Sequence, residues 1–144
     1  MDREALAARA LELHGCNCNC AQSVACSLAP FVGADEDVCF HAAEGFGAGM
    51  GGLTETCGAL SGGIMILGFA MSNGIDEPTN KAATYRLVRQ LLERFREQNG
   101  STTCADLKGA TTGTPLRSCN GCIEDALAIT ADLLEEHHLA TCST

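Results

Sequence analysis

The stretch at residues 45–72 reads GFGAGMGGLTETCGALSGGIMILGFAMS, and the fold predicted for this chain depends on it. Its first part is rich in glycine, which weakens a helix interior and suits a loop that passes close to another segment. From Leu60 onward, apolar residues recur at helical spacing and fill nearly every face of the helix. We therefore expect a glycine-rich loop that leads into a buried central helix.

Cys57 lies where this loop meets the helix. We expect the hydroxyl of Thr54 or Thr56 to cap the helix start. Cys57 then falls in the first turn, where unpaired amides and the helix dipole favour a negative charge. A thiol in this position loses its proton more easily than an ordinary thiol. Cys57 is therefore the first candidate for a reactive or metal-binding residue.

The composition limits the classes of protein to consider. With 144 residues, 46% hydrophobic and only 4% aromatic, residues 1–144 predict one domain with an aliphatic core, which suits packed helices. The net charge of −9 argues against nucleic acid and against an anionic membrane surface as partners. No apolar run is long enough to span a bilayer.

The ten cysteines need a chemical reason. The N-terminal sequence MDREALAARALEL is charged and amphipathic, unlike a secretion signal, so we expect a cytoplasmic protein with reduced thiols. Metal binding or thiol redox chemistry then explains the cysteines better than a disulfide framework does.

Apolar spacing along the rest of the chain predicts an all-α, single-domain bundle of five or six helices around the central apolar helix. Besides that helix, we expect helices at about residues 3–14, 20–28, 35–43, 78–98 and 119–138, with a short helical piece at 104–108. No strand pattern and no internal repeat is visible. Because the central helix is apolar on nearly all sides, one chain would leave part of it exposed, and this predicts a homodimer.

Four cysteines share one feature, because each follows a candidate capping residue at the start of a predicted helix: Cys20, Cys57, Cys104 and Cys119. If these helix starts converge, four thiolates surround one site. Four cysteinates suit zinc and iron–sulfur clusters equally well. Their spacing matches neither a local zinc ribbon nor a ferredoxin motif, so the fold would have to assemble the site.

The sequence CGALSG at residues 57–62 resembles the CGAxxG signature of the C_GCAxxG_C_C family of redox-active proteins. The segments at 19–24, 45–51 and 104–107, and the one that begins at Cys119, are similar to the family as well. The resemblance covers nearly the whole chain and implies redox activity. It places the four cysteines of the family on Cys20, Cys57, Cys104 and Cys119.

Additional cysteines extend this pattern. Cys16 and Cys18 turn Cys20 into a CxCxC run, and Cys122 forms a C-x-x-C pair with Cys119. No thioredoxin-like βαβ pattern surrounds that pair. Cys18 and Cys122 are therefore second-tier metal ligands, since either one could replace a neighbouring cysteine.

Three functions remain open at this point. We favour an iron–sulfur cluster on the four cysteines, used for electron transfer or redox sensing with a partner protein. The alternatives are a thiol–disulfide redox protein, which could be an oxidoreductase, with Cys57 as the reactive thiolate, and a structural zinc protein. Cys26 and Cys39 are expected in the core and Cys142 in the C-terminal tail, all three outside the site.

Overall fold

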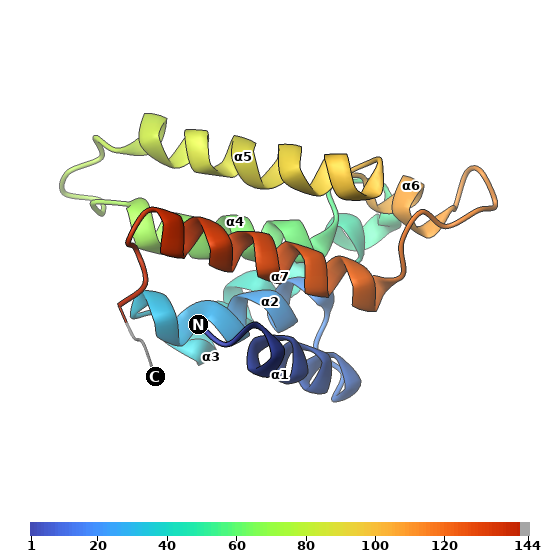
Figure 1. The fold of residues 1–144 in the computed structure, drawn as a ribbon, viewed down its shortest axis with the longest axis horizontal. Coiled ribbons are helices and arrows are strands. Elements are labelled where there is room, and N and C mark those ends of the chain that lie inside the picture. The colour runs from blue at the N-terminus through green and yellow to red at the C-terminus, as the bar shows by residue number, and fades with distance from the viewer. Residues whose placement is uncertain (142–144) are drawn as a thin grey trace.

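The computed structural model describes residues 1–141 and confirms the all-α class (Figure 1). Apart from one isolated antiparallel bridge between Thr56 and Thr103, no β pairing occurs within this range. The α-helices are α1 (Arg3–Gly15), α2 (Cys20–Leu28), α3 (Glu36–Ala43), α4 (Gly58–Met71), α5 (Lys81–Asn99), α6 (Cys104–Lys108) and α7 (Cys119–Glu136). Three short turns of 3₁₀ or π geometry join them, at Ala29–Val32, Glu44–Phe46 and Gly49–Leu53.

Capping residues explain where most helices begin. The side chains of Asp2, Asp35 and Ser118 each accept hydrogen bonds from amides in the first turn of α1, α3 and α7. Asn19 and Gln22 form a reciprocal capping box at the start of α2. The bounds predicted for these helices are therefore close to those observed.

The start of α5 differs from the prediction. The helix begins at Lys81 rather than near residue 78, because the preceding segment forms turns. The amide of Glu77 donates to the carbonyl of Gly74, and the amide of Thr79 donates to the carbonyl of Glu77. Asn80 then donates a side-chain hydrogen bond to the carbonyl of Met71, which ties the turn to the end of α4.

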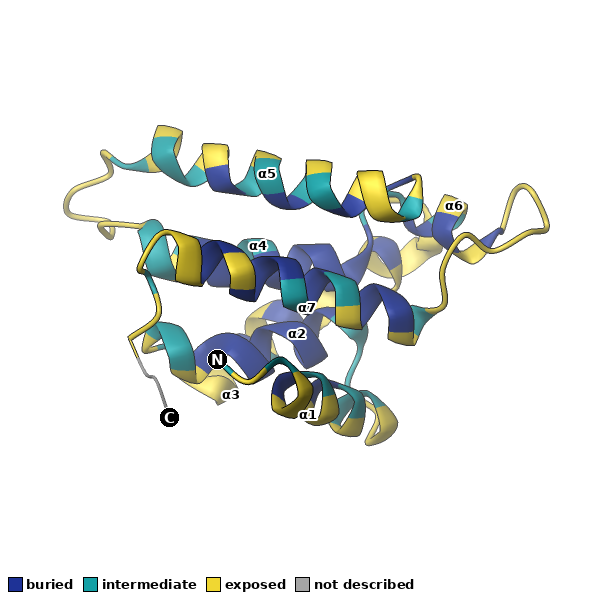
Figure 2. Cartoon of the chain, in the orientation of Figure 1, coloured by how far each residue is buried: buried dark blue, intermediate teal, exposed yellow. Residues whose placement is uncertain are grey.

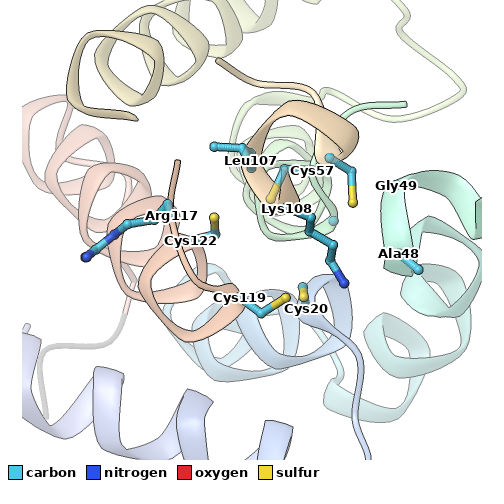
Figure 3. Close-up of a pocket in the computed structure, with 11 residues that line it drawn as sticks. Cys20, Ala48, Gly49, Cys57, Leu107, Lys108, Arg117, Cys119 and Cys122 are labelled. Atoms are coloured by element: carbon cyan, nitrogen blue, oxygen red, sulfur yellow. The ribbon is translucent and has the colours of Figure 1, made fainter. Parts of the chain in front are cut away.

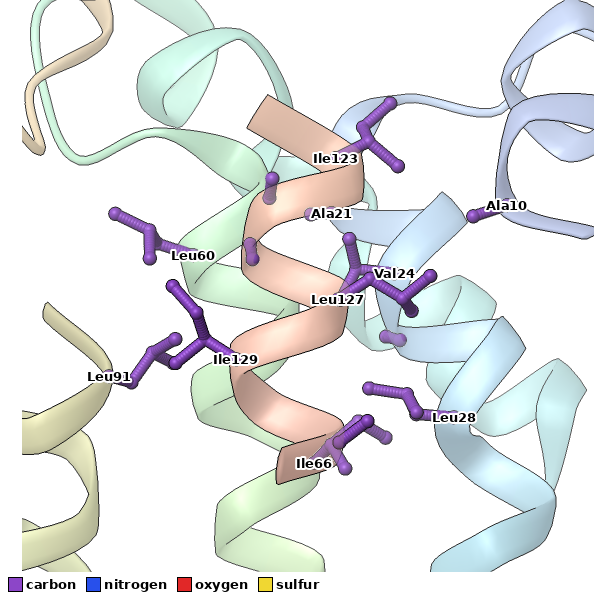
Figure 4. Packing of buried hydrophobic residues seen from close by; sticks show 14 of the residues in the cluster. Ala10, Ala21, Val24, Leu28, Leu60, Ile66, Leu91, Ile123, Leu127 and Ile129 are labelled. Atoms are coloured by element: carbon purple, nitrogen blue, oxygen red, sulfur yellow. The ribbon is translucent and has the colours of Figure 1, made fainter. Parts of the chain in front are cut away.

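As predicted, α4 lies at the centre of the bundle, where it packs against α2, α5 and α7 (Figures 1 and 2). Helix α1 packs on α2 and α7, and α3 covers the far side of α2. Aliphatic side chains from these helices meet in one continuous core (Figure 4). Its largest fully buried members are Phe95, Leu28, Leu60, Ile66, Leu67, Leu91, Leu107, Ile123, Leu127, Leu133, Leu134 and Val24.

Two adjacent glycines allow α4 to approach its neighbours very closely. A Cβ atom on Gly62 would lie 2.5 Å from the carbonyl oxygen of Ala21 in α2, and one on Gly63 would lie 2.5 Å from Oγ1 of Thr130 in α7. No other residue fits at this spacing without movement of a helix. Because Ala21 follows Cys20 directly, the contact at Gly62 also brings the start of α2 next to α4.

None of the helices within residues 1–141 is both long and apolar enough to cross a membrane.

Candidate functional site

A small cavity lies where the starts of α2, α4, α6 and α7 meet, and it is lined by five cysteines (Figure 3). These are the four first-tier candidates and one of the second tier: Cys20, Cys57, Cys104, Cys119 and Cys122. Ala48, Gly49, Gly58, Leu107, Lys108 and Arg117 complete the lining. The cavity holds about 20 Å³, which is room for roughly one water molecule. The fold thus assembles the dispersed cysteines around one point.

Cys57 itself occupies the cap position of α4. No side-chain oxygen caps this helix, so the predicted cap by Thr54 or Thr56 is wrong. The side chain of Cys57 makes no capping hydrogen bond either, but the nearby backbone amides of Ala59 and Leu60 favour its charged form and lower its pKa. The sulfur of Cys57 therefore lies where a serine or aspartate oxygen usually caps a helix.

A short antiparallel bridge holds Cys57 beside Cys104. The amide of Cys57 donates to the carbonyl of Thr102 over 2.8 Å, and the amide of Cys104 donates to the carbonyl of Glu55 over 2.8 Å. These two bonds flank the pairing of Thr56 with Thr103. Two segments almost fifty residues apart in the sequence thus meet in fixed register at the cavity.

The glycine-rich loop passes directly against the cysteine site, as predicted. A Cβ atom on Gly49 would lie 2.5 Å from Cβ of Cys104 and 3.2 Å from its sulfur. Gly49 also has a positive φ of 55°, and the neighbouring Ala48 has a φ of 53°. Left-handed backbone at a non-glycine residue carries a conformational cost, which the surrounding structure must support. The loop is therefore shaped for close contact with the cavity.

The electrostatics of the cavity distinguish Cys57 from the other cysteines. Hydrogen bonding from the Cys122 thiol, together with the amides of Ala59 and Leu60 and the charge of Lys108, lowers the pKa of Cys57 to about 7, although burial opposes this shift. Cys57 is therefore partly a thiolate near neutral pH. This agrees with the acidity that its position in the sequence predicts.

The same prediction fails for two other cysteines at helix starts. Burial, followed by the neighbouring sulfurs of Cys119 and Cys57, raises the pKa of Cys20 to about 12. Burial also raises the pKa of Cys104, although Lys108 partly offsets it. A helix start is thus not sufficient to make a thiol acidic when the sulfur is desolvated next to other sulfurs.

Cys122 has the opposite role to Cys57. It donates to the Cys57 sulfur, and this hydrogen bond, together with burial, raises the pKa of Cys122 far above its ordinary value. Cys57 and Cys122 are only 6% and 3% exposed. They form a buried pair in which Cys57 is the more acidic thiol and Cys122 the less acidic one.

Two cations line the cavity, and the sequence analysis did not single out either of them. Burial disfavours the charge of Lys108, but Cys119, through its charge and a hydrogen bond, raises the pKa of Lys108 overall. Arg117 is paired with Asp125, with 3.0 Å between Nε and Oδ2. Lys108 lies one helical turn after Cys104, and this spacing could have indicated from the sequence that the two side chains share one face of α6.

The remaining cysteines lie away from the cavity lining. Cys26 and Cys39 are buried in the core, as predicted, and Cys16 is exposed. Cys18 is half-buried and does not line the cavity. Cys142 falls outside the described residues.

The cysteines of the cavity suit a metal centre in type and number but not in placement. Cysteine thiolates are the usual ligands of iron–sulfur clusters and of structural zinc, so the donor type and number fit either group. The spacing does not fit, since within residues 1–141 no three His, Cys, Asp or Glu side chains are placed to hold one metal ion.

A family model described as "Putative redox-active protein (C_GCAxxG_C_C)" matches residues 18–133. The chain belongs to this family of redox-active proteins. No curated protein and no solved structure gave a match. The matched range includes every cysteine that lines the cavity.

Proposed function

We propose that this redox-active protein works by reversible thiol–disulfide exchange, with Cys57 as the nucleophile and Cys122 as its disulfide partner. One observation carries the proposal: Cys57 and Cys122 are both buried and line the same cavity, where the pKa of Cys57 is lowered to about 7, most strongly by Cys122. The thiolate is the reactive form of cysteine, and a nucleophile with a pKa near ambient pH reacts fastest in exchange. A resolving thiol in direct contact lets the intermediate close to a disulfide.

The reaction balances on these two residues. In the oxidising direction, the Cys57 thiolate attacks one sulfur of a disulfide presented at the cavity and releases the other as a thiolate. Cys122 then gives up its proton and attacks the Cys57 sulfur, which releases the second thiol of that disulfide. The pair loses two electrons and one proton, and the attacked disulfide gains them.

An iron–sulfur cluster is the second candidate, and the number of thiols favours it. A dithiol pair needs two cysteines, whereas five line this cavity, and Cys20, Cys57, Cys104 and Cys119 would supply the four ligands. Bound there, a cluster would supply one-electron transfer. The cysteine side chains would have to turn to admit it, because the cavity holds only about 20 Å³. Zinc bound by the same four cysteines would contribute stability without redox chemistry.

One preparation distinguishes these candidates. The protein is purified without oxygen and analysed for iron, acid-labile sulfide, zinc and visible absorption, and its free thiols are then counted before and after one equivalent of oxidised dithiothreitol. Thiol exchange predicts a colourless, metal-free protein that loses two thiols reversibly. Stoichiometric iron and sulfide would support the cluster instead, and stoichiometric zinc would support the structural site.

Variants locate the activity. Cys57→Ser and Cys122→Ser should each leave the remaining member of the pair as a free thiol after oxidation, as mapped by mass spectrometry, because either change removes one sulfur of the pair. Cys16→Ser is the matched control, since Cys16 is exposed and lies outside the cavity lining. Loss of the Cys122 thiol on oxidation of Cys57→Ser would contradict the proposed function.

A further inference from the structure

The cavity contains a second pair of cysteines that the proposed reaction does not use. Cys20, Cys119 and Lys108 all line the cavity, and Cys119 raises the pKa of both Cys20 and Lys108. Figure 3 shows the Lys108 side chain extending toward the sulfurs of both cysteines. We call Cys20 and Cys119 the outer pair, and Cys57 and Cys122 the inner pair.

The two pairs differ in their access to solvent. Both outer cysteines are half-buried, whereas both inner cysteines are buried. Thiol–disulfide exchange requires the attacking sulfur to approach the external disulfide directly, so rates depend on access. A cavity of about 20 Å³ does not admit a disulfide that carries substituents. The inner pair therefore needs a route for electrons other than direct attack on a bulky disulfide.

The outer pair provides that route. Cys20 links the two pairs, because both Cys119 and Cys57 raise its pKa. Cys57 in turn interacts with Cys122, which lowers the pKa of Cys57. All four sulfurs line one cavity. Lys108 supplies a positive charge next to Cys119. This charge would stabilise the Cys119 thiolate, both when Cys119 attacks a disulfide and when it is the leaving group.

We infer that the four cysteines form a disulfide relay, in which Cys119 reacts with external disulfides and the outer pair passes the disulfide to the inner pair. This inference rests on the proposed function, because it assumes that the inner pair is a redox dithiol. It assigns the contact with substrate to Cys119, and it assigns a positioning role to Lys108.

Each step conserves atoms and electrons. With oxidised glutathione as the external disulfide, the Cys119 thiolate forms a mixed disulfide and releases glutathione thiolate. Cys20 attacks Cys119 to close the outer disulfide, and its proton leaves with the second glutathione. The Cys57 thiolate then attacks Cys20 and releases the Cys119 thiolate. Finally Cys122 attacks Cys57, and its proton passes to Cys20.

The test compares a bulky oxidant with a small one on the full chain. Reduced wild-type, Cys119→Ser and Cys20→Ser proteins are treated without oxygen with either oxidised glutathione or hydrogen peroxide. Samples are quenched with acid and alkylated, and disulfides are mapped by mass spectrometry. Cys16→Ser serves as the control for loss of a cysteine outside the cavity.

The relay predicts that glutathione disulfide oxidises the inner pair about tenfold or more slowly in Cys119→Ser than in the wild type. The reason is that the bulky disulfide enters through the sulfur of Cys119. Peroxide, which is close to water in size, should still oxidise the inner pair of this variant at nearly the wild-type rate. Cys20→Ser should accumulate a glutathione adduct on Cys119.

The possible failures are distinguishable. If glutathione disulfide oxidises the inner pair of Cys119→Ser as fast as that of wild type, the relay is wrong and the proposed function stands. If neither oxidant ever produces an inner disulfide in the wild type, the proposed function itself is wrong. Absence of the adduct in Cys20→Ser would also count against Cys119 as the point of entry.

Discussion

Cys57 and Cys26 are equally buried, each 6% exposed, yet their surroundings give them opposite chemistry. The pKa of Cys57 is lowered to about 7, whereas burial and the nearby Cys39 and Glu36 raise the pKa of Cys26 to about 11. Cys122 and two backbone amides lower the pKa of Cys57, while Cys26 donates a hydrogen bond to the carbonyl of Glu36 over 3.5 Å. Burial alone therefore does not decide the reactivity of a cysteine in this protein.

Charge sharpens the contrast between the two regions. Lys108 stands beside the cavity, whereas the acidic start of α3 stands beside Cys26 and Cys39. Asp35 and Glu36 raise the pKa of Cys39 further, after burial. A thiolate is stabilised by donors and cations and destabilised by carboxylates. The surroundings of Cys57 in the cavity therefore favour a thiolate, whereas those of Cys26 and Cys39 favour neutral thiols.

The largest expected effect is the difference in oxidative labelling between Cys57 and Cys26. At pH 7.5 their pKa values of about 7 and about 11 give thiolate fractions that differ by about three orders of magnitude. Oxidative labelling by hydrogen peroxide, which is close to water in size, should be slow at Cys57 below pH 7, where the thiol is protonated, and fast above it when followed by mass spectrometry from pH 5 to 10. Labelling of Cys26 should stay low throughout. Equal profiles for the two sites would refute the contrast.

Removing the donor to Cys57 should shrink this contrast. In Cys122→Ala the sulfur of Cys57 loses the hydrogen bond that lowers its pKa most, so the midpoint of its labelling profile should rise by about one pH unit or more. Cys39→Ala removes a buried cysteine outside the cavity and should leave the Cys57 profile unchanged. A shift of similar size in both variants would point to a general loosening of the core.

The close contact between α4 and α2 should be a structural requirement of the cavity. Gly62→Ala places a Cβ atom 2.5 Å from the Ala21 carbonyl oxygen, so we expect a loss of about 1–3 kcal/mol in the free energy of unfolding. Gly68→Ala, in the same helix, meets no atom within 4 Å and should stabilise the protein by about 0.5–1 kcal/mol. Urea titration measures both, and equal effects would contradict this packing.

The smallest expected effect comes from Lys108. The charge of Lys108 makes the smallest of the four contributions that lower the pKa of Cys57. The residue is also exposed to solvent, which weakens its effect. Lys108→Gln should therefore raise the labelling midpoint of Cys57 by less than about half a pH unit, with the shift reduced by added salt. Lys81→Gln, at the start of α5, is the control. A shift above one unit would mean that the charge outweighs the Cys122 hydrogen bond.

Much of the fold could be predicted because its signals are local. Apolar spacing and capping residues indicated the helices, and four cysteines at predicted helix starts indicated the cavity, where all four lie. The start of α4 was misjudged because a sulfur, rather than a threonine oxygen, takes the cap position. The sequence alone does not reveal which of two neighbouring groups faces the amides.

The pairing of the thiols could not be predicted, because it depends on how the helices pack. Cys119 and Cys122 are three residues apart and suggest a local pair, yet Cys122 contacts Cys57 and Cys119 contacts Cys20. The approach of α4 to α2 at Gly62 and the bridge from Thr56 to Thr103 create these contacts. Both link segments that are distant in the sequence.

The identity of the first disulfide that forms tests the central claim most directly. Reduced protein is treated without oxygen with one equivalent of hydrogen peroxide, alkylated and digested on both sides of Cys57, and the linked peptides are sequenced by fragmentation. Our account predicts a bond between Cys57 and Cys122, with Cys26 and Cys39 recovered as alkylated thiols. A disulfide between Cys26 and Cys39, or a Cys57 thiol that stays reduced after the peroxide is consumed, would contradict it.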